Sequence, residues 1–324
     1  PRMDEVLIGS ILASTLRVSV PLILCALAGV LCERAGVIDL GLEGKMLMTA
    51  FAAASVGTWT GSLTLALVAA AVVGVMLSML HGYACVSHGG DQVVLGMAIT
   101  MTAAGLTVVL GIAWFAQGGQ TPALPDSVRL SDWFGDAGAL VAQVPWVGKL
   151  LALAFFNHNL MVYGSLAAVA GVWWLLYRTR FGLRLRAAGE NPVMVDAAGV
   201  SVKLVRYQAL ALNGVLSSLA GAYLVLAQNP SFIPNMTAGR GYMALAALIF
   251  GKWHPVGALW ACLLFGFLDA ASIRLQGTPL PIIGAVPVQA IQALPYVLTV
   301  VLLAGFIGNA IAPKALGRPY VKER

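Results

Sequence analysis

The sequence predicts an all-α protein: a polytopic bundle of about eight to ten transmembrane helices, with discontinuous elements in both halves. Of its 324 residues, 60% are hydrophobic and 10% are charged, whereas soluble domains carry roughly 25% charged residues. Several uninterrupted apolar runs exceed the ~18 residues that mark a membrane helix. The alternating apolar and polar strands of a membrane barrel are absent from the sequence.

Long apolar segments provide most of the predicted crossings. Each is long enough to cross the membrane as a helix: 6–31, 63–85, 93–115, 160–177, 207–227, 255–275 and 294–311. Arg17 lies near the middle of the first segment, where a charge costs at least ~2.5 kcal/mol on insertion scales. We therefore predict a structural ion pair between Arg17 and Asp269, with Arg274 as the alternative partner of Asp269.

A polar block, residues 32–48 (CERAGVIDLGLEGKMLM), interrupts the front half and contains Glu33, Asp39 and Glu43. The apolar stretch within and after it, 46–59, would cover only about 21 Å as a helix, short of a ~30 Å hydrocarbon core. We expect the block to enter the membrane as a broken element, which is tolerated only when it is buried in protein or lines a water-filled cavity. The three carboxylates are therefore candidates for the substrate pathway, and an ordinary interfacial loop is the alternative.

The back half contains a second short crossing. Residues 228–241 are polar and broken by proline and glycine, and the apolar stretch 243–253 is too short to span as a helix. One such element in each half is the pattern that points to a transporter binding site at a repeat interface. Asn213, Gln228 and Asn229 complete the candidate pathway residues. For Asn213, a role in helix packing and a role in the substrate pathway are equally weighted alternatives.

Residues 178–206 form the longest polar run between two membrane-length segments and hold six of the nineteen Lys and Arg residues. The positive-inside rule places this loop in the cytoplasm, together with the basic tail. Pro192 disfavours helix at Asn191 before it. A second short helix, about 193–198, then ends at Gly199, a natural position just past a helix end. Two short helices on this face suggest a docking surface for a soluble partner.

We expect a single transmembrane domain over residues 1–324. Its parts are a front half, 1–159, with an external loop, 116–159, and a short interfacial helix near 147–156; a back half, 160–312, with the cytoplasmic loop 178–206; and a cytoplasmic tail, 313–324.

Several kinds of chemistry are not indicated. The sequence has no P-loop for ATP and no catalytic or metal-binding arrangement, so we expect a transport subunit that is not an enzyme. The four cysteines, in or beside apolar segments, are expected to be small buried hydrophobes. We read His81 and His88 as interfacial. The net charge of +6 does not indicate nucleic acid, because ten of the nineteen basic residues lie in the central loop and the tail.

Three motifs, in order along the chain, resemble those of ABC-importer permeases for branched-chain amino acids, simple sugars and nucleosides. They are residues 32–48; R-x-R-A-x-G-E-N-P at 184–192 followed by A-G-V at 198–200; and GRGYMALAALIFGKWHPVG at 239–257. The resemblance covers nearly the whole chain. Asp39 stands where this family usually has asparagine, which suggests either an ion pair with Arg34 or a change in selectivity.

This resemblance implies a multi-pass permease of the bacterial inner membrane that moves a small polar solute inward by alternating access. A separate ATPase would bind ATP and Mg²⁺, so no cofactor is expected on this chain. The other implied partners are a second permease, identical or homologous, an external substrate-binding protein and the lipid bilayer. The resemblance assigns coupling to the ATPase to Arg186, Gly189, Glu190, Asn191, Pro192, Ala198 and Gly199.

The compact form of the chain is most similar to the nucleoside and simple-sugar members, so we expect a nucleoside first and a sugar next. Phe51, Trp59 or Phe250 are candidates for an apolar wall against the base. A branched-chain amino acid permease is the alternative within the family. An ion-coupled secondary transporter is the alternative outside it, but this class predicts a relay of intramembrane carboxylates or histidines, and only Asp269 lies well within a long span.

Overall fold

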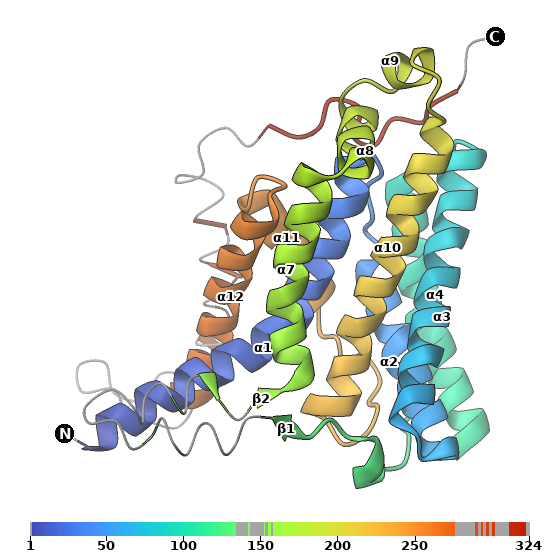
Figure 1. The fold of residues 1–324 in the computed structure, drawn as a ribbon. Helices are drawn as coiled ribbons and strands as arrows, with labels where there is room; N and C mark the ends of the chain where they lie inside the picture. Colours follow the sequence, from blue (N-terminus) through green and yellow to red (C-terminus); the bar gives the residue numbers. More distant parts are fainter. Residues whose placement is uncertain are drawn as a thin grey trace.

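The computed structural model describes residues 2–133, 158–275 and 311–321, with a few isolated positions in between. Its long helices pack side by side as one bundle (Figure 1). The short helices α8 and α9 lie at one end of the bundle, and the strands β1 and β2 lie at the other. We call these the α8–α9 end and the β1–β2 end.

The long helices are α1 (Arg2–Arg34), α2 (Leu42–Thr60), α3 (Leu63–Gly82), α4 (Gln92–Phe115), α7 (Leu160–Arg178), α10 (Val202–Tyr223) and α12 (Pro255–Leu275). The shorter ones are α8 (Arg180–Glu190), α9 (Pro192–Ala197) and α11 (Arg240–Phe250). π-Helical turns extend α3 over Tyr83–Ser87 and α10 over Leu224–Gln228, and a 3₁₀ turn covers Asp126–Val128. The strands β1 (Asp132–Trp133) and β2 (His158–Asn159) pair antiparallel.

Six helices in the described part of the chain are long and apolar enough to cross a membrane. They are Ile8–Arg34, Leu63–Ser87, Gln92–Phe115, Leu160–Arg178, Val202–Gln228 and Pro255–Ile273. These helices confirm six of the seven predicted long spans. The seventh, 294–311, and the interfacial helix predicted near 147–156 fall largely outside the described residues.

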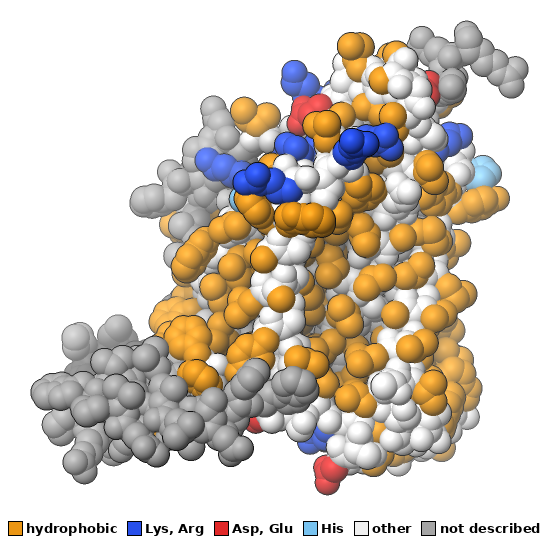
Figure 2. Space-filling view, in the orientation of Figure 1, with side chains coloured by type: hydrophobic (Ala, Val, Ile, Leu, Met, Phe, Trp, Pro, Cys, Tyr) orange, Lys and Arg blue, Asp and Glu red, His pale blue; other side chains and the backbone are white. Residues whose placement is uncertain are grey.

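Helices α1 and α10 form the centre of the bundle, whereas α3 and α4 lie at its edge. The apolar stretch of α1 is 83% buried, but those of α3 and α4 are each only 22% buried. Apolar side chains cover the flank of the bundle, and Lys and Arg gather near the α8–α9 end (Figure 2). An apolar flank with charged side chains at the end is what a bilayer environment requires. All four cysteines are buried, as predicted.

Both predicted discontinuities are present, but the first is shorter than expected. Only residues 35–41 are non-helical, and α2 begins at Leu42, so Glu43 and Lys45 lie within the helix. The helix can begin this early because protein partners compensate both charges. In the back half, residues 229–239 form turns before α11, whose 11 residues reach only about 16 Å.

The short helices α8 and α9 follow the local signals in the sequence. Asn191 ends α8 and caps α9, because its Oδ1 accepts the backbone N–H of Met194 at 3.2 Å. Gly199 takes φ +80° just past α9, and the N–H of Val200 bonds back to the carbonyl of Val195. This left-handed ending is common at helix C-termini and confirms the predicted second short helix.

Candidate functional site

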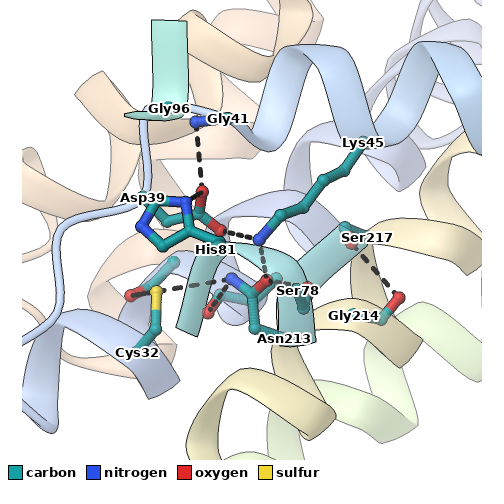
Figure 3. A network of polar contacts seen from close by, with 12 residues as sticks. Cys32, Asp39, Gly41, Lys45, Ser78, His81, Gly96, Asn213, Gly214 and Ser217 are labelled. Carbon is teal, nitrogen blue, oxygen red and sulfur yellow. Dashed lines mark hydrogen bonds and ion pairs between the residues drawn. The ribbon is translucent and has the colours of Figure 1, made fainter. Parts of the chain in front are cut away.

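A buried polar cluster lies where residues 35–41 meet α2, α3 and α10 (Figure 3). Lys45 Nζ donates to Asp39 Oδ2 at 2.6 Å and to Asn213 Oδ1 at 3.0 Å. His81 Nδ1 lies 3.6 Å from Asp39 Oδ1. All four side chains are 0% exposed. A buried charge requires a partner and hydrogen bonds, and here the irregular segment and the helix that follows it provide them for each other.

The Asn213 amide connects several elements at once. Its oxygen also accepts from Ser78 Oγ at 3.1 Å, and its nitrogen donates to the carbonyl of Ala28 at 3.0 Å and to Cys32 Sγ at 3.3 Å. One side chain on α10 therefore binds groups on α1, α2 and α3. Of the two roles predicted for Asn213, these contacts favour packing.

Glu43 joins the two broken crossings to each other. Its Oε1 accepts the N–H of Gly239 at 2.8 Å, and its Oε2 accepts the N–H of Gly241 at 2.6 Å. The first N–H groups of a helix have no partner within it, so the carboxylate on α2 caps α11. A Cβ on Gly241 would lie 2.6 Å from Glu43 Cα, which explains why glycine is needed at this contact.

The far end of α11 is held by the end of α1. Trp253 Nε1 donates to Glu33 Oε2 at 2.5 Å, and Arg34 Nε donates to the carbonyl of Trp253 at 2.9 Å. Arg34 therefore binds the turn after α11, and the cation paired with Asp39 is Lys45. The suggested Asp39–Arg34 pair is wrong, because Arg34 ends α1 while Asp39 lies beyond the turn that follows it.

A cavity of about 800 Å³ opens at the β1–β2 end. It is lined by α1, residues 129–132, the end of α10 and α12. Arg17 Nη2 lies 3.9 Å from Asp132 Oδ2, and these side chains are 47% and 54% exposed. Arg17 Nε also donates to His158 Nδ1 at 3.3 Å. The cavity thus presents an accessible cation and an accessible anion side by side.

Gln228 lines this cavity and links it to α11. Its Nε2 donates to the carbonyl of Arg17 at 3.0 Å, and its Oε1 accepts from Arg240 Nη1 at 3.0 Å. Arg240 is the first residue of α11. Asn229 instead donates to the carbonyl of Leu224 at 3.4 Å and is not among the lining residues.

The predicted Arg17–Asp269 ion pair does not form among the described residues. Arg17 lies against Asp132 and His158, and the α12 residues that line the cavity are Ala270 and Ile273. Asp269 is not among the residues that line the cavity. The side chain of Arg274 lies outside the described residues.

Of the predicted pathway residues, only Gln228 lines the cavity. Glu33, Asp39, Glu43 and Asn213 are buried and bound to protein partners. They hold the interrupted helices in place in the described structure, and their contribution to a substrate pathway stays a prediction.

The three aromatic side chains predicted to form an apolar wall pack against other aromatic rings of the bundle. Phe51 packs against Phe232, and Phe250 against Phe265, with ring centroids 5.1 and 5.6 Å apart. Trp59 stacks on Phe115 at 5.8 Å. None of these rings lines the cavity at the β1–β2 end; Phe51 and Trp59 line a separate apolar cavity of about 410 Å³.

Sequence reasoning missed Lys45 and His81 as members of the buried cluster. The reading of His81 as interfacial is wrong, because the ring is 0% exposed and lies beside Asp39. The signal was Lys45, the fifth charge of the block, because a lysine needs an acidic partner once α2 starts at Leu42.

At the α8–α9 end, a groove of about 400 Å³ runs between the two short helices. Its lining is mostly apolar and consists of Leu183, Arg184, Ala187, Glu190, Asn191, Met194, Val195, Ala198 and Val200. Leu183 is 62% exposed and Met194 is 65% exposed. Apolar side chains left open beside charged ones are typical of a protein interaction site.

The predicted coupling residues divide into two groups. Glu190, Asn191, Ala198 and Gly199 are exposed, Pro192 is half-buried and Gly189 is buried. A Cβ on Gly189 would clash with the carbonyl oxygen of Arg34, so α8 rests directly on the end of α1. The guanidinium of Arg186 lies over the ring of Tyr177, 4.6 Å from its centroid. Gly189 and Arg186 therefore anchor the short helices to the bundle.

The C-terminal tail ties this anchor to the α1–α2 turn. The N–H of Ala315 donates to the carbonyl of Gly189 at 2.9 Å, and the N–H of Gly317 to that of Gly36 at 3.1 Å. Buried Arg206 donates to the carbonyls of Ala35 and Arg318, both at 3.1 Å. We call residues 311–321 the tail strap.

Residues 11–307 match the family model described as the permease component of branched-chain amino acid transport systems. The chain belongs to this permease family. The permease is 38% identical over 332 residues to the guanosine ABC transporter permease NupQ of Bacillus subtilis, covering 99% of this chain and 100% of the relative. It is 36% identical to the nucleoside ABC transporter permease NupC of Lactococcus lactis, covering 97% of each chain.

More distant comparisons agree on the class of protein. The ribose import permease RbsC of Escherichia coli is 26% identical over 72% of this chain and 68% of its own. A solved inward-facing ABC transporter described as of the metal-chelate type shares the fold, with a TM-score of 0.50 at 15% identity over 91% of this chain and 85% of that one. The permease is thus the membrane subunit of an ABC importer and a multi-pass inner-membrane protein.

Proposed function

We propose that this permease imports nucleosides. The observation that carries the proposal is the similarity, over nearly the full chain, to two permeases named for guanosine and for nucleosides, at 38% and 36% identity. The ribose permease is less similar and matches a smaller part of the chain. A simple sugar is therefore the second candidate, and a branched-chain amino acid, suggested by the family description, is the third.

A separate ATPase, which holds ATP and Mg²⁺, docks at the groove between α8 and α9. The support is the exposed apolar lining of this groove and the surrounding basic residues, which favour a cytoplasmic location by the positive-inside rule. Leu183 and Met194 offer apolar contacts, and Arg180 and Arg184 fit an acidic rim on the partner. ATP hydrolysis takes place on that chain.

Motion of the ATPase reaches the bundle through α8. Gly189 rests on the end of α1, and the turn after α1 leads into the buried cluster around Asp39 and Lys45. Glu43 then passes a displacement of α2 to α11. Alternating access follows if these interrupted elements shift as a unit, as in other transporters with broken helices. A second permease, identical or homologous, completes the pathway, and a substrate-binding protein delivers the nucleoside at the β1–β2 end.

Uptake of radiolabelled nucleosides by cells that express the permease with its ATPase, second permease and substrate-binding protein tests the proposal. We expect guanosine or uridine uptake that an excess of ribose or leucine does not compete. Competition by ribose or by leucine, with no nucleoside uptake, would assign the sugar or the amino acid instead.

Co-purification tests the docking surface. We expect Met194→Glu to abolish co-purification of the ATPase, because it places a charge in the apolar groove. The matched control is Val321→Glu, since Val321 is 77% exposed in the tail strap and lies outside the groove. Equal ATPase recovery in both variants would rule out the groove.

A further inference from the structure

The cavity at the β1–β2 end lies where the two halves of the permease meet. Arg17, Asp132 and Asn159 come from the front half, and Gln228 and Ala270 come from the back half. Transporter substrate sites form at such interfaces, beside interrupted helices. The volume of about 800 Å³ lies within the ~300–1,000 Å³ range of small-molecule pockets.

We propose that this cavity binds the ribose ring of a nucleoside, with Asp132 as the hydrogen-bond acceptor and Arg17 as the donor. The proposal rests on the proposed nucleoside import and adds a site to it. The Arg17 and Asp132 side chains are about half exposed, so both remain accessible to a solute in the cavity.

The chemistry of the pair matches a vicinal diol. A hydroxyl both donates and accepts, a carboxylate only accepts, and a guanidinium only donates. Two neighbouring hydroxyls can therefore donate to Asp132 and accept from Arg17 in one orientation. Dinucleotide-binding folds recognise ribose in the same way, with an acidic side chain on its hydroxyl groups. Arg17 Nη2 and Asp132 Oδ2 are 3.9 Å apart, which is longer than a direct hydrogen bond.

The site is also connected to the moving elements. Gln228 binds the backbone of Arg17 on one side and the side chain of Arg240, the first residue of α11, on the other. A ligand that draws Arg17 toward it thus acts, through one intervening side chain, on the helix that Glu43 caps. An isolated surface pocket would lack this connection.

Cysteine protection tests the site on the complete complex of permeases and ATPases in lipid nanodiscs, without the substrate-binding protein. All four native cysteines of this chain are buried, so Ser131→Cys, at a position that lines the cavity, supplies the chain's one accessible thiol, and labelling is read on this chain alone. We expect guanosine or uridine, whichever the complex transports, to slow maleimide labelling at this position at least about fivefold. The corresponding 2′,3′-dideoxynucleoside should give no protection. The control is Ser127→Cys, exposed in the 3₁₀ turn outside the cavity, which should label at the same rate with either ligand.

A second variant tests the role of the carboxylate. In the Ser131→Cys background, Asp132→Asn should raise the ligand concentration needed for protection about tenfold or more, the loss expected for a hydrogen bond to a charged group. Asp126→Asn, an exposed carboxylate in the same loop outside the cavity, should leave it unchanged.

The outcomes separate the site from the transported solute. Nucleoside uptake with no protection at residue 131, or with equal protection by the dideoxy analogue, would overturn the ribose site and leave the proposed function standing. Absence of nucleoside uptake, with protection by ribose alone, would overturn nucleoside import and keep a site for the sugar ring.

Discussion

The carboxylate of Glu43 accepts the backbone N–H of Gly241 at 2.6 Å. A side chain in the first turn of α2 therefore caps the N-terminus of α11, and so links the two interrupted crossings. The two residues are 198 positions apart in the chain. Helix N-termini favour negative charge, and Glu43 supplies it where neither α2 nor α11 has a side-chain cap of its own.

Removing this cap should weaken the permease. We expect Glu43→Ala to lower its Tm in detergent by about 5 °C, because buried N–H groups lose hydrogen bonds to a charged acceptor worth about 1.5–3 kcal/mol. Glu43→Gln, which keeps one acceptor, should fall in between. Glu190→Gln is the control. Glu190 is exposed, so the Tm of this variant should match that of the wild type. A wild-type Tm for Glu43→Ala would show that the cap contributes no stability.

The Asp39–Lys45 pair can be tested with a double-mutant cycle. Asp39→Asn should destabilise the permease by about 3–5 kcal/mol, because it leaves the Lys45 charge buried without its partner. Lys45→Met in the same chain should recover most of the loss, since neutral, well-packed side chains replace buried ion pairs at little cost. Thermal unfolding of the four proteins measures the coupling. Losses that simply add would mean that the two side chains act independently.

Gly189 should be essential for coupling. A Cβ at this position would clash with the carbonyl of Arg34, so Gly189→Ala should push α8 away from α1. We expect the amount of nucleoside taken up per ATP hydrolysed to fall about tenfold, which corresponds to about 1.4 kcal/mol. The ratio of nucleoside taken up to ATP hydrolysed in proteoliposomes measures this. Gly171→Ala on α7 is the matched control, because nothing lies within 4 Å of an added Cβ there. An unchanged ratio in Gly189→Ala would contradict a role for this contact.

The tail strap should contribute to the same coupling. Deleting residues 313–324 removes the bonds from Ala315 to Gly189 and from Gly317 to Gly36, and leaves Arg206, which is 1% exposed, with fewer partners. We expect a lower Tm and ATP hydrolysis that continues while uptake falls. Deleting only residues 322–324 keeps the described strap and should change neither quantity. Full uptake by the longer deletion would show that the strap is dispensable.

The crossings and the short helices could be predicted because their signals are local. A run of apolar residues determines whether a segment suits the bilayer, and the positions of Pro192 and Gly199 are enough to delimit α9. The sequence predicts too late a start for α2, because charged residues in a membrane segment favour an unwound backbone. The partners of Glu43 and Lys45, which keep this turn helical, lie in distant parts of the chain.

The partners of charged residues could not be predicted for a related reason. Asp39 and Lys45 are separated by a break, so the i, i+4 rule for helices does not connect them. His81 comes from another helix. Arg17 pairs with Asp132, which lies in β1, and the apolar content of the spans does not indicate which residue outside them reaches a charge within the first span.

The opposite directions of α2 and α11 have a mechanical consequence. The starts of both helices lie beside the Glu43 carboxylate. From there α2 runs toward the β1–β2 end, where Gly61 follows it and accepts a hydrogen bond from Ser127. Helix α11 runs toward Trp253 and the end of α1. Because each helix is stiff along its axis, the Glu43 carboxylate is the point at which a movement of α2 is transmitted to α11. A displacement of this one point therefore moves structure at both faces of the bundle in the same step.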